Sequence, residues 1–109
     1  MRARAAAFTV AAMPQPLAVD PDALRAAAAV LDDQAAALAT AHGAWDAEVH
    51  AALPGWVAES RRALEDLAGQ WGADAAALTA RMREIAAGLR VSAASFAEAD
   101  RMHARALGE

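Results

Sequence analysis

The sequence predicts an all-α fold: an antiparallel two-helix hairpin that associates into a four-helix bundle or coiled-coil dimer. Two long stretches repeat apolar residues at alternating steps of three and four, the spacing of a helical seam. Pro54 and Gly55 separate the two stretches, and both residue types interrupt helices. Hydrophobic residues make up 58% of the chain, but most are alanine, with only two Phe, three Trp and no Tyr. One hairpin alone would therefore bury little area, and association with another chain is expected.

The chain is expected to begin with a flexible tail over residues 1–19. Arg2 and Arg4 precede an apolar stretch from Ala5 to Met13, which has the outline of a signal peptide. The stretch is short and lacks a convincing small-x-small cleavage site, so we favour a tail. Met13 is an alternative translation start. No run in the sequence approaches the roughly 20 apolar residues that span a bilayer.

The hairpin domain is predicted over residues 20–109, with its first helix over about 21–52. Asp20 is a suitable N-cap, and Pro21 fits the first helical position. Gly43 costs about 1 kcal/mol relative to alanine, which leaves a kink or an early end open at that point. The seam of this helix alternates small and large residues, namely Leu24, Ala28, Leu31, Ala35, Leu38, His42, Trp45, Val49 and Ala52.

A turn is predicted over residues 53–56 and a second helix over about 57–107. Pro54 has no N–H for a helical hydrogen bond, and Gly55 tolerates the positive φ angle of a tight turn. The second seam continues the same spacing, with one extra step of four at Trp71. It comprises Leu64, Leu67, Trp71, Ala75, Leu78, Met82, Ile85, Leu89, Ser92, Phe96, Ala99 and His103.

The two predicted helices differ in length. At 1.5 Å per residue the first spans about 48 Å, so it covers an antiparallel second helix only to about Gly88. On the remaining overhang, Phe96 and Asp100 lie one turn apart on nearly the same helix face. Either the N-terminal tail or a second subunit covers this strip, or the ring and the carboxylate are presented together to a partner protein.

Charge and composition argue against several classes of function. The net charge is -4, and no basic patch is long enough to follow a phosphate backbone, so nucleic-acid binding is not expected. The sparse basic residues also disfavour an amphipathic helix that binds a membrane surface. Because the chain has no Cys, it has neither a disulfide framework nor a thiolate site.

No group of residues suggests catalysis, a metal ion or a cofactor. His42 and His50 lie eight residues apart without a further ligand pattern, so His42 is expected in the seam. The adjacent acids of Asp32–Asp33 and Glu65–Asp66 point in different directions on a helix. No glycine-rich phosphate loop and no nucleophile elbow is present in the sequence. We therefore expect a protein that is not an enzyme and needs no cofactor.

One run of residues begins at the turn and closes at Trp71. Trp56-Val57-Ala58-Glu59-Ser60 leads through Ala63-Leu64 to Trp71, fifteen residues after Trp56. This run resembles the pattern Trp-x-Gly-x-Ala-x-x-Ala-Phe, with a closing aromatic, of the WXG family of helical hairpins exported by type VII (ESX) secretion systems. Phe96-Ala97-Glu98-Ala99-Asp100 is similar to the family's Tyr-x-x-x-Asp/Glu export signal. The start from Leu17 to Ala28 is similar to the EspC-like branch.

Two positions depart from the family pattern. Ala58 stands where the family has Gly, so the tight turn would use Gly55, just after Pro54. Phe96 replaces the Tyr of the export signal and keeps the ring while losing the hydroxyl. A partner protein could then carry the export signal for the pair.

The resemblance implies a secreted or cell-surface protein that is exported without a cleaved signal peptide. It also implies a folded dimer with itself or a related hairpin, and recognition by type VII secretion machinery. Trp56 would lie partly exposed at the hairpin tip as a recognition surface, whereas Trp71 is expected to be a core residue. A cytoplasmic coiled-coil adaptor or chaperone, which holds a partner helix in the same seam, is the alternative.

Overall fold

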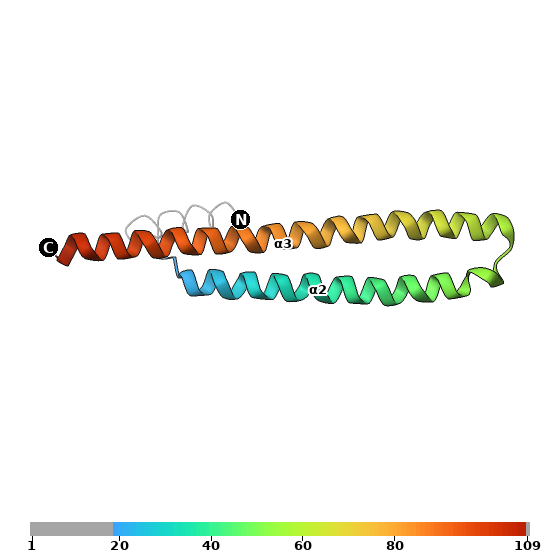
Figure 1. The fold of residues 1–109 in the computed structure, drawn as a ribbon, viewed down its shortest axis with the longest axis horizontal. Coiled ribbons are helices and arrows are strands. Elements are labelled where there is room, and N and C mark those ends of the chain that lie inside the picture. Colours follow the sequence, from blue (N-terminus) through green and yellow to red (C-terminus); the bar gives the residue numbers. More distant parts are fainter. Residues whose placement is uncertain (1–18, 109) are drawn as a thin grey trace, which may run out of the picture.

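The computed structural model describes residues 19–108, which form two long antiparallel helices joined by a short turn (Figure 1). Helix α2 runs over Pro21–Ala52, the 3-10 turn η1 over Leu53–Gly55, and helix α3 over Ala58–Gly108. Within these described residues there is no β-strand, and the predicted antiparallel hairpin is confirmed. The ranges expected from the sequence are 21–52 and about 57–107. The expected N-terminal tail lies outside the described residues, apart from Val19.

Helix α2 begins with the predicted cap. Asp20 has an extended backbone, with φ -95 and ψ 108, and its Oδ1 accepts a hydrogen bond of 2.9 Å from the N–H of Asp22. Its carbonyl accepts a second bond of 3.2 Å from the N–H of Leu24. These bonds satisfy backbone groups that a helix start leaves unpaired. Cap and Pro21 together therefore fix where the helix starts.

Gly43 neither ends nor interrupts α2, so the early end that its composition left open is wrong. The helix continues for nine residues beyond it, to Ala52. A side chain at position 43 would meet no atom within 4 Å, so this glycine is not needed for close packing. The residues around it, which include several alanines, favour helix strongly enough to offset the cost of one glycine.

The turn reverses the chain without a left-handed residue. Leu53 is almost fully buried, and its carbonyl accepts a bond of 3.0 Å from the N–H of Trp56. Trp56 is extended, with φ -99 and ψ 146, and no residue of the described chain has a positive φ angle. The expectation that Gly55 supplies a positive φ is therefore wrong, because a 3-10 turn followed by one extended residue is sufficient.

The seam between the helices is built mainly from small side chains. Ala28 and Ala35 of α2 are fully buried, as are Ala86 and Ala93 of α3. Ala68 and Thr79 complete the buried positions of α3. Small residues at successive turns let two helix backbones approach closely, but they supply little apolar area. The hairpin is thus held together along a narrow line.

On α3 the buried line is shifted from the predicted seam. Leu67, Leu78 and Ile85 are 38%, 53% and 44% exposed, so they do not fill the interior of the hairpin. The buried residue at each of these turns is the next one along the chain, namely Ala68, Thr79 and Ala86. The other predicted packing residues are half-buried in the hairpin: Leu24, Leu31, Leu38, Trp45, Leu64, Met82 and Leu89.

Helix α3 extends beyond both ends of its pairing with α2. Residues 54–63 are all exposed, so α3 meets α2 only from about Leu64. At the other end Ala93 is fully buried, and an Arg90 Nη2 to Asp32 Oδ2 ion pair of 2.6 Å joins the helices. Helix α2 therefore covers α3 beyond Gly88, the limit expected from the sequence. The limit is shifted because the chain uses several residues to cross from α2 to α3, so the pairing begins later in α3. Figure 1 shows α3 continuing past the start of α2.

Candidate functional site

Two tryptophans, one from each helix, pack together in the part of the hairpin nearer the turn. The ring centroids of Trp45 and Trp71 lie 5.0 Å apart at an interplanar angle of 46°. The ring of His42 lies 5.5 Å from that of Trp45. Tilted contacts of this kind stabilise aromatic pairs beyond the area that they bury. Trp71 remains 43% exposed, so this predicted core residue lies at the edge of the core.

The tryptophan pair marks one broad side of the hairpin. Leu38 and Leu31 precede Trp45 by seven and fourteen residues, and Leu78 and Ile85 follow Trp71 by the same steps. Seven residues are nearly two helical turns, so these side chains lie on the same side as the tryptophans. We call this surface the apolar face. It comprises Leu31, Leu38, Trp45, Leu67, Trp71, Leu78 and Ile85.

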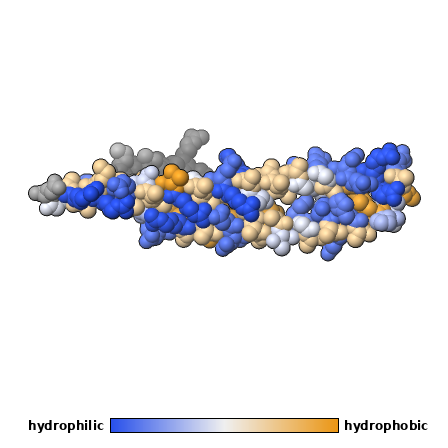
Figure 2. Space-filling view, in the orientation of Figure 1, coloured by the Kyte–Doolittle hydropathy of each residue, from blue (hydrophilic) through white to orange (hydrophobic). Residues whose placement is uncertain are grey.

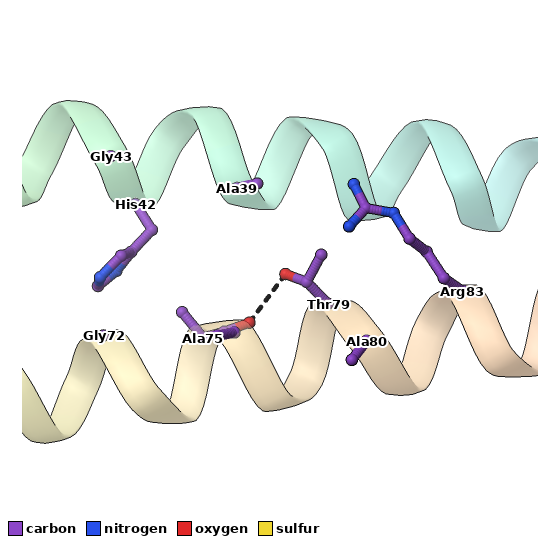
Figure 3. A pocket seen from close by; sticks show the side chains of 9 residues that line it. Ala39, His42, Gly43, Gly72, Ala75, Thr79, Ala80 and Arg83 are labelled. Atoms are coloured by element: carbon purple, nitrogen blue, oxygen red, sulfur yellow. Dashed lines mark hydrogen bonds between the residues drawn. The ribbon is translucent and has the colours of Figure 1, made fainter.

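The opposite side carries a shallow groove rather than large side chains. The groove has a volume of about 300 Å³. Its lining consists of Ala39, His42, Gly43, Gly72, Ala75, Ala76, Thr79, Ala80 and Arg83 (Figure 3). Ala80 and Arg83 follow Leu78 by two and five residues, which places them on the far side of α3 from the apolar face. We call this surface the groove face.

Polar groups of the groove are partly satisfied within the hairpin. The hydroxyl of Thr79 donates a bond of 2.8 Å to the carbonyl of Ala75, one turn earlier in α3 (Figure 3). The ring of His42 points toward α3 beside Gly72, where an added Cβ would lie 3.7 Å from Nε2. That nitrogen is buried without a hydrogen-bond partner. An alanine at position 72 would therefore make an ordinary van der Waals contact with the imidazole, so the close packing of His42 does not require glycine there.

Hydrophilic surface is abundant along the hairpin. Figure 2 shows one broad side, on which strongly hydrophilic surface alternates with weakly hydrophobic surface. Several exposed ion pairs join two residues of the same helix. In α2, Arg25 Nη1 lies 2.9 Å from Asp22 Oδ1, and in α3, Arg101 Nη2 lies 2.6 Å from Glu98 Oε2. Exposed pairs of this kind contribute about 1 kcal/mol or less each. Their main effect is on solubility.

The hairpin tip presents the residues of the turn motif. Trp56 is 49% exposed, and the neighbouring Val57 is 72% exposed. Pro54 and Gly55 lie in η1, while Ala58 is the first residue of α3. The carbonyl of Val57 already accepts a helical bond of 2.7 Å from Arg61. Ala58 therefore does not need the backbone conformations that only glycine adopts readily. Trp71, the last residue of the motif, lies against Trp45 of α2.

The C-terminal overhang carries the second pair of candidate residues. Phe96 is 41% exposed, and Asp100 is exposed one helical turn later. Residues four apart are neighbours on a helix surface, so the ring and the carboxylate share one face of α3. Phe96 follows Leu78 by eighteen residues, which is five full helical turns, so the two side chains lie on the same side of α3. The overhang thus continues the line of the apolar face.

No other chemistry is evident in the described part of the chain. Among residues 19–108, no group of three or more His, Asp or Glu side chains is placed to hold a metal ion. None of the described helices is long and apolar enough to cross a membrane. What the geometry offers is surface for contact with other proteins: the apolar face, the tip and the overhang.

Comparison with family models gives a match over residues 16–101, to the model described as WXG100, proteins of 100 residues with WXG. The match covers α2, the turn and α3 as far as Arg101. The chain belongs to the WXG100 family. Comparisons with curated proteins and with solved structures gave no match.

WXG100 membership decides between the two functional classes that the sequence suggests. WXG100 proteins are small, non-enzymatic substrates of type VII (ESX) secretion systems, and they are secreted without a signal peptide. Their hairpins pair with one another and form four-helix bundles. This confirms the predicted fold class, secretion and lack of enzymatic activity, and it disfavours a cytoplasmic adaptor.

The sequence reasoning missed that the large and small residues of α3 have different roles. Because every repeated apolar residue was assigned to one seam, Leu67, Leu78 and Ile85 were expected inside the hairpin. The signal that could have separated the roles is a small residue directly after each of them: Ala68, Thr79 and Ala86. A large apolar residue followed by a small one, recurring at helical spacing, is typical of a helix that contacts two neighbours.

Proposed function

We propose that this WXG100 chain is exported as a folded pair of hairpins, joined through the apolar face to itself or to a related hairpin. The observation that carries the proposal is the exposure of large side chains on one side of α3, with Leu78 at 53% and Ile85 at 44%. Large apolar residues that recur along one side of a helix mark an interaction surface. A second hairpin on this side would complete a four-helix bundle.

We propose further that Phe96 and Asp100 form the export signal. In support, Phe96 is 41% exposed and Asp100 is exposed, so both side chains are accessible near the C-terminal end of α3. A ring and a carboxylate on one face suit a pocket with an apolar wall and a basic group. The start from Leu17 to Ala28, which is similar to the EspC-like branch, supports a place for this chain within that part of the superfamily. Residues 17 and 18 lie outside the described structure.

Trp56 forms a separate recognition surface in this proposal. Its ring is half exposed at the tip, far along the hairpin from the overhang (Figure 1). An exposed tryptophan beside an exposed Val57 gives a small apolar patch of the kind that proteins use to dock. The tip and the overhang would then contact different parts of the secretion machinery.

The proposal is tested by export of defined variants. The protein is measured in culture supernatant and cell lysate, with and without an active type VII ATPase. Phe96→Ala and Asp100→Asn are expected to stay in the lysate with unchanged thermal stability, whereas Phe96→Tyr should be exported as well as the wild type. Val91→Ala, an exposed change on the same overhanging helix, is the matched control. Normal export of both Phe96→Ala and Asp100→Asn would refute the signal.

A further inference from the structure

We infer that residues 1–18 of this chain dock on the C-terminal part of α3 and cover the proposed export signal until the secretion machinery displaces them. The inference rests on the proposed function, because it assigns a regulator to the same site. The receiving surface is one face of α3, which we call the C-terminal strip: Phe96, Asp100, His103 and Leu107. Their spacing of four, three and four residues puts these side chains on one face of the helix.

The C-terminal strip is accessible in the described structure. Phe96 and Leu107 are 41% and 75% exposed, and the side chains of Asp100 and His103 between them are exposed as well. The strip lies in the part of the hairpin where α2 starts and α3 continues past it (Figure 1). An aromatic ring and a leucine on one helix face offer apolar area that another segment can remove from water.

The chain enters α2 at the level of this strip. An ion pair of 2.6 Å joins Asp32 of α2 to Arg90 of α3, so these two residues lie at about the same height along the hairpin. Val19 precedes Asp32 by thirteen residues, and His103 follows Arg90 by thirteen residues. Because the helices are antiparallel and have the same rise per residue, Val19 lies at about the level of His103. Residues 1–18 are therefore attached beside the strip itself.

The attached segment has the length and the side chains to cover the strip. Phe96 and Leu107 are eleven residues apart, or about 17 Å along α3, which about six residues of extended chain can span. Residues 1–18 therefore reach both ends of the strip. Arg2 and Arg4 carry the charge opposite to that of Asp100. The large apolar side chains of the segment are Phe8, Val10, Met13 and Leu17.

Covalent attachment makes a weak contact effective. Short linkers give effective concentrations on the order of 1 mM, so a contact with a Kd of about 0.1 mM is closed about ten times as often as it is open. A receptor that binds Phe96 and Asp100 competes with the segment, and its apparent affinity falls by the open fraction, about tenfold. The docked segment thus holds the signal back, and receptor binding displaces it.

The first test measures amide hydrogen exchange at the C-terminal strip in the full chain. Phe8→Ser combined with Leu17→Ser removes two apolar contacts of the segment, so amides of residues 97–107 should exchange about tenfold faster than in the wild type. Thr9→Ser combined with Gln15→Ser changes two polar positions of the same segment, and this matched control should exchange like the wild type. Amides of residues 64–89, where α3 is paired with α2, are the internal reference and should not change.

Exchange at the strip that is the same in the wild type and in the variant with Phe8→Ser and Leu17→Ser would overturn the docking. Any protection of the strip would then come from a second chain. This result would leave the proposed export signal standing, because the signal requires only that Phe96 and Asp100 reach the machinery.

Export rates test whether the docked segment regulates the signal. In the assay of culture supernatant and lysate, the variant with Phe8→Ser and Leu17→Ser should be exported faster than the wild type, by up to about tenfold. Adding Phe96→Ala to this variant should abolish export, because the signal itself is then lost. Wild-type export of a variant whose strip has become unprotected would overturn the regulatory role. Normal export of Phe96→Ala alone would refute the proposed signal, whereas hydrogen exchange would still decide whether the segment docks.

Discussion

The apolar face and the groove face lie on the same two helices but differ in the side chains that they expose. On the apolar face, leucine, isoleucine and tryptophan recur every seven residues and remain half exposed. On the groove face, alanine and glycine predominate, and Asp32 and Arg90 join the helices by an ion pair. Small residues fill the fully buried positions between the helices, whereas in our proposal the large, half-exposed ones also contact a second chain. The difference shows that one apolar repeat can provide both the contact between the two helices of a hairpin and a surface for a second chain.

A lysine on the apolar face should have the largest effect. Leu78→Lys would place a charge in the centre of the pairing surface, and burial of an unpaired charge is strongly unfavourable. We expect pairing to weaken by about 100-fold or more in sedimentation. Ala80→Lys adds the same charge two residues away on the groove face and should leave pairing unchanged. Equal losses in both variants would erase the distinction between the faces.

Trp71 and Trp56 sharpen the comparison, because both are half exposed in one hairpin but only Trp71 lies on the apolar face. In the paired protein, Trp71→Ala should lower the free energy of unfolding by about 3 kcal/mol, since the contact with Trp45 and the pairing surface are both lost. Trp56→Ala should cost less than about 1 kcal/mol and reduce export. Denaturant unfolding measures both. A cost near 3 kcal/mol for Trp56→Ala would make it a core residue and refute its role in recognition.

Within the hairpin, the seam should reject larger residues. Ala86 is fully buried where the helices approach closely, so Ala86→Leu should destabilise the hairpin by about 1–3 kcal/mol through overpacking. The adjacent Ile85 faces outward, and Ile85→Leu should change the free energy of unfolding by less than about 1 kcal/mol. If thermal denaturation ranked the two variants in the opposite order, the assignment of small residues to the seam would be wrong.

The smallest effect is expected at Gly43. It lies within a continuous helix, and an added Cβ would meet no atom within 4 Å. Gly43→Ala should therefore stabilise the protein by about 0.5–1 kcal/mol, through the better helix propensity of alanine. Thermal unfolding at fixed protein concentration is the measurement. A lower melting temperature for Gly43→Ala would show that a contact with a partner requires the glycine.

Much of the fold could be predicted from local signals. Asp20 and Pro21 define the start of α2 through their own backbone chemistry, and Pro54 marks the end of the same helix. The repeat of three and four predicted both helices. The match in spacing between Trp56 and Trp71 predicted the family. These features depend on neighbours in the sequence, so they can be read without knowledge of the packing.

The side of α3 that faces α2 could not be predicted in the same way. Leu78 and Thr79, like Ile85 and Ala86, are adjacent positions that both suit an interface, and the choice depends on how closely the backbones approach. The extent of the overhang also depended on geometry, because the tip uses residues 54–63 before the helices meet. Both features are properties of the pair of helices rather than of either one.

The most direct test of the central claim asks whether the apolar face becomes covered. In a variant that keeps only Trp71, with Trp45→Phe and Trp56→Phe, the fluorescence of one indole reports on this face. As the protein concentration rises through the range of dimerisation, the emission should shift to shorter wavelength and quenching by acrylamide should fall. A Trp71 that stays equally accessible to acrylamide at every concentration, while the protein sediments as a dimer, would show that the chains pair through another surface.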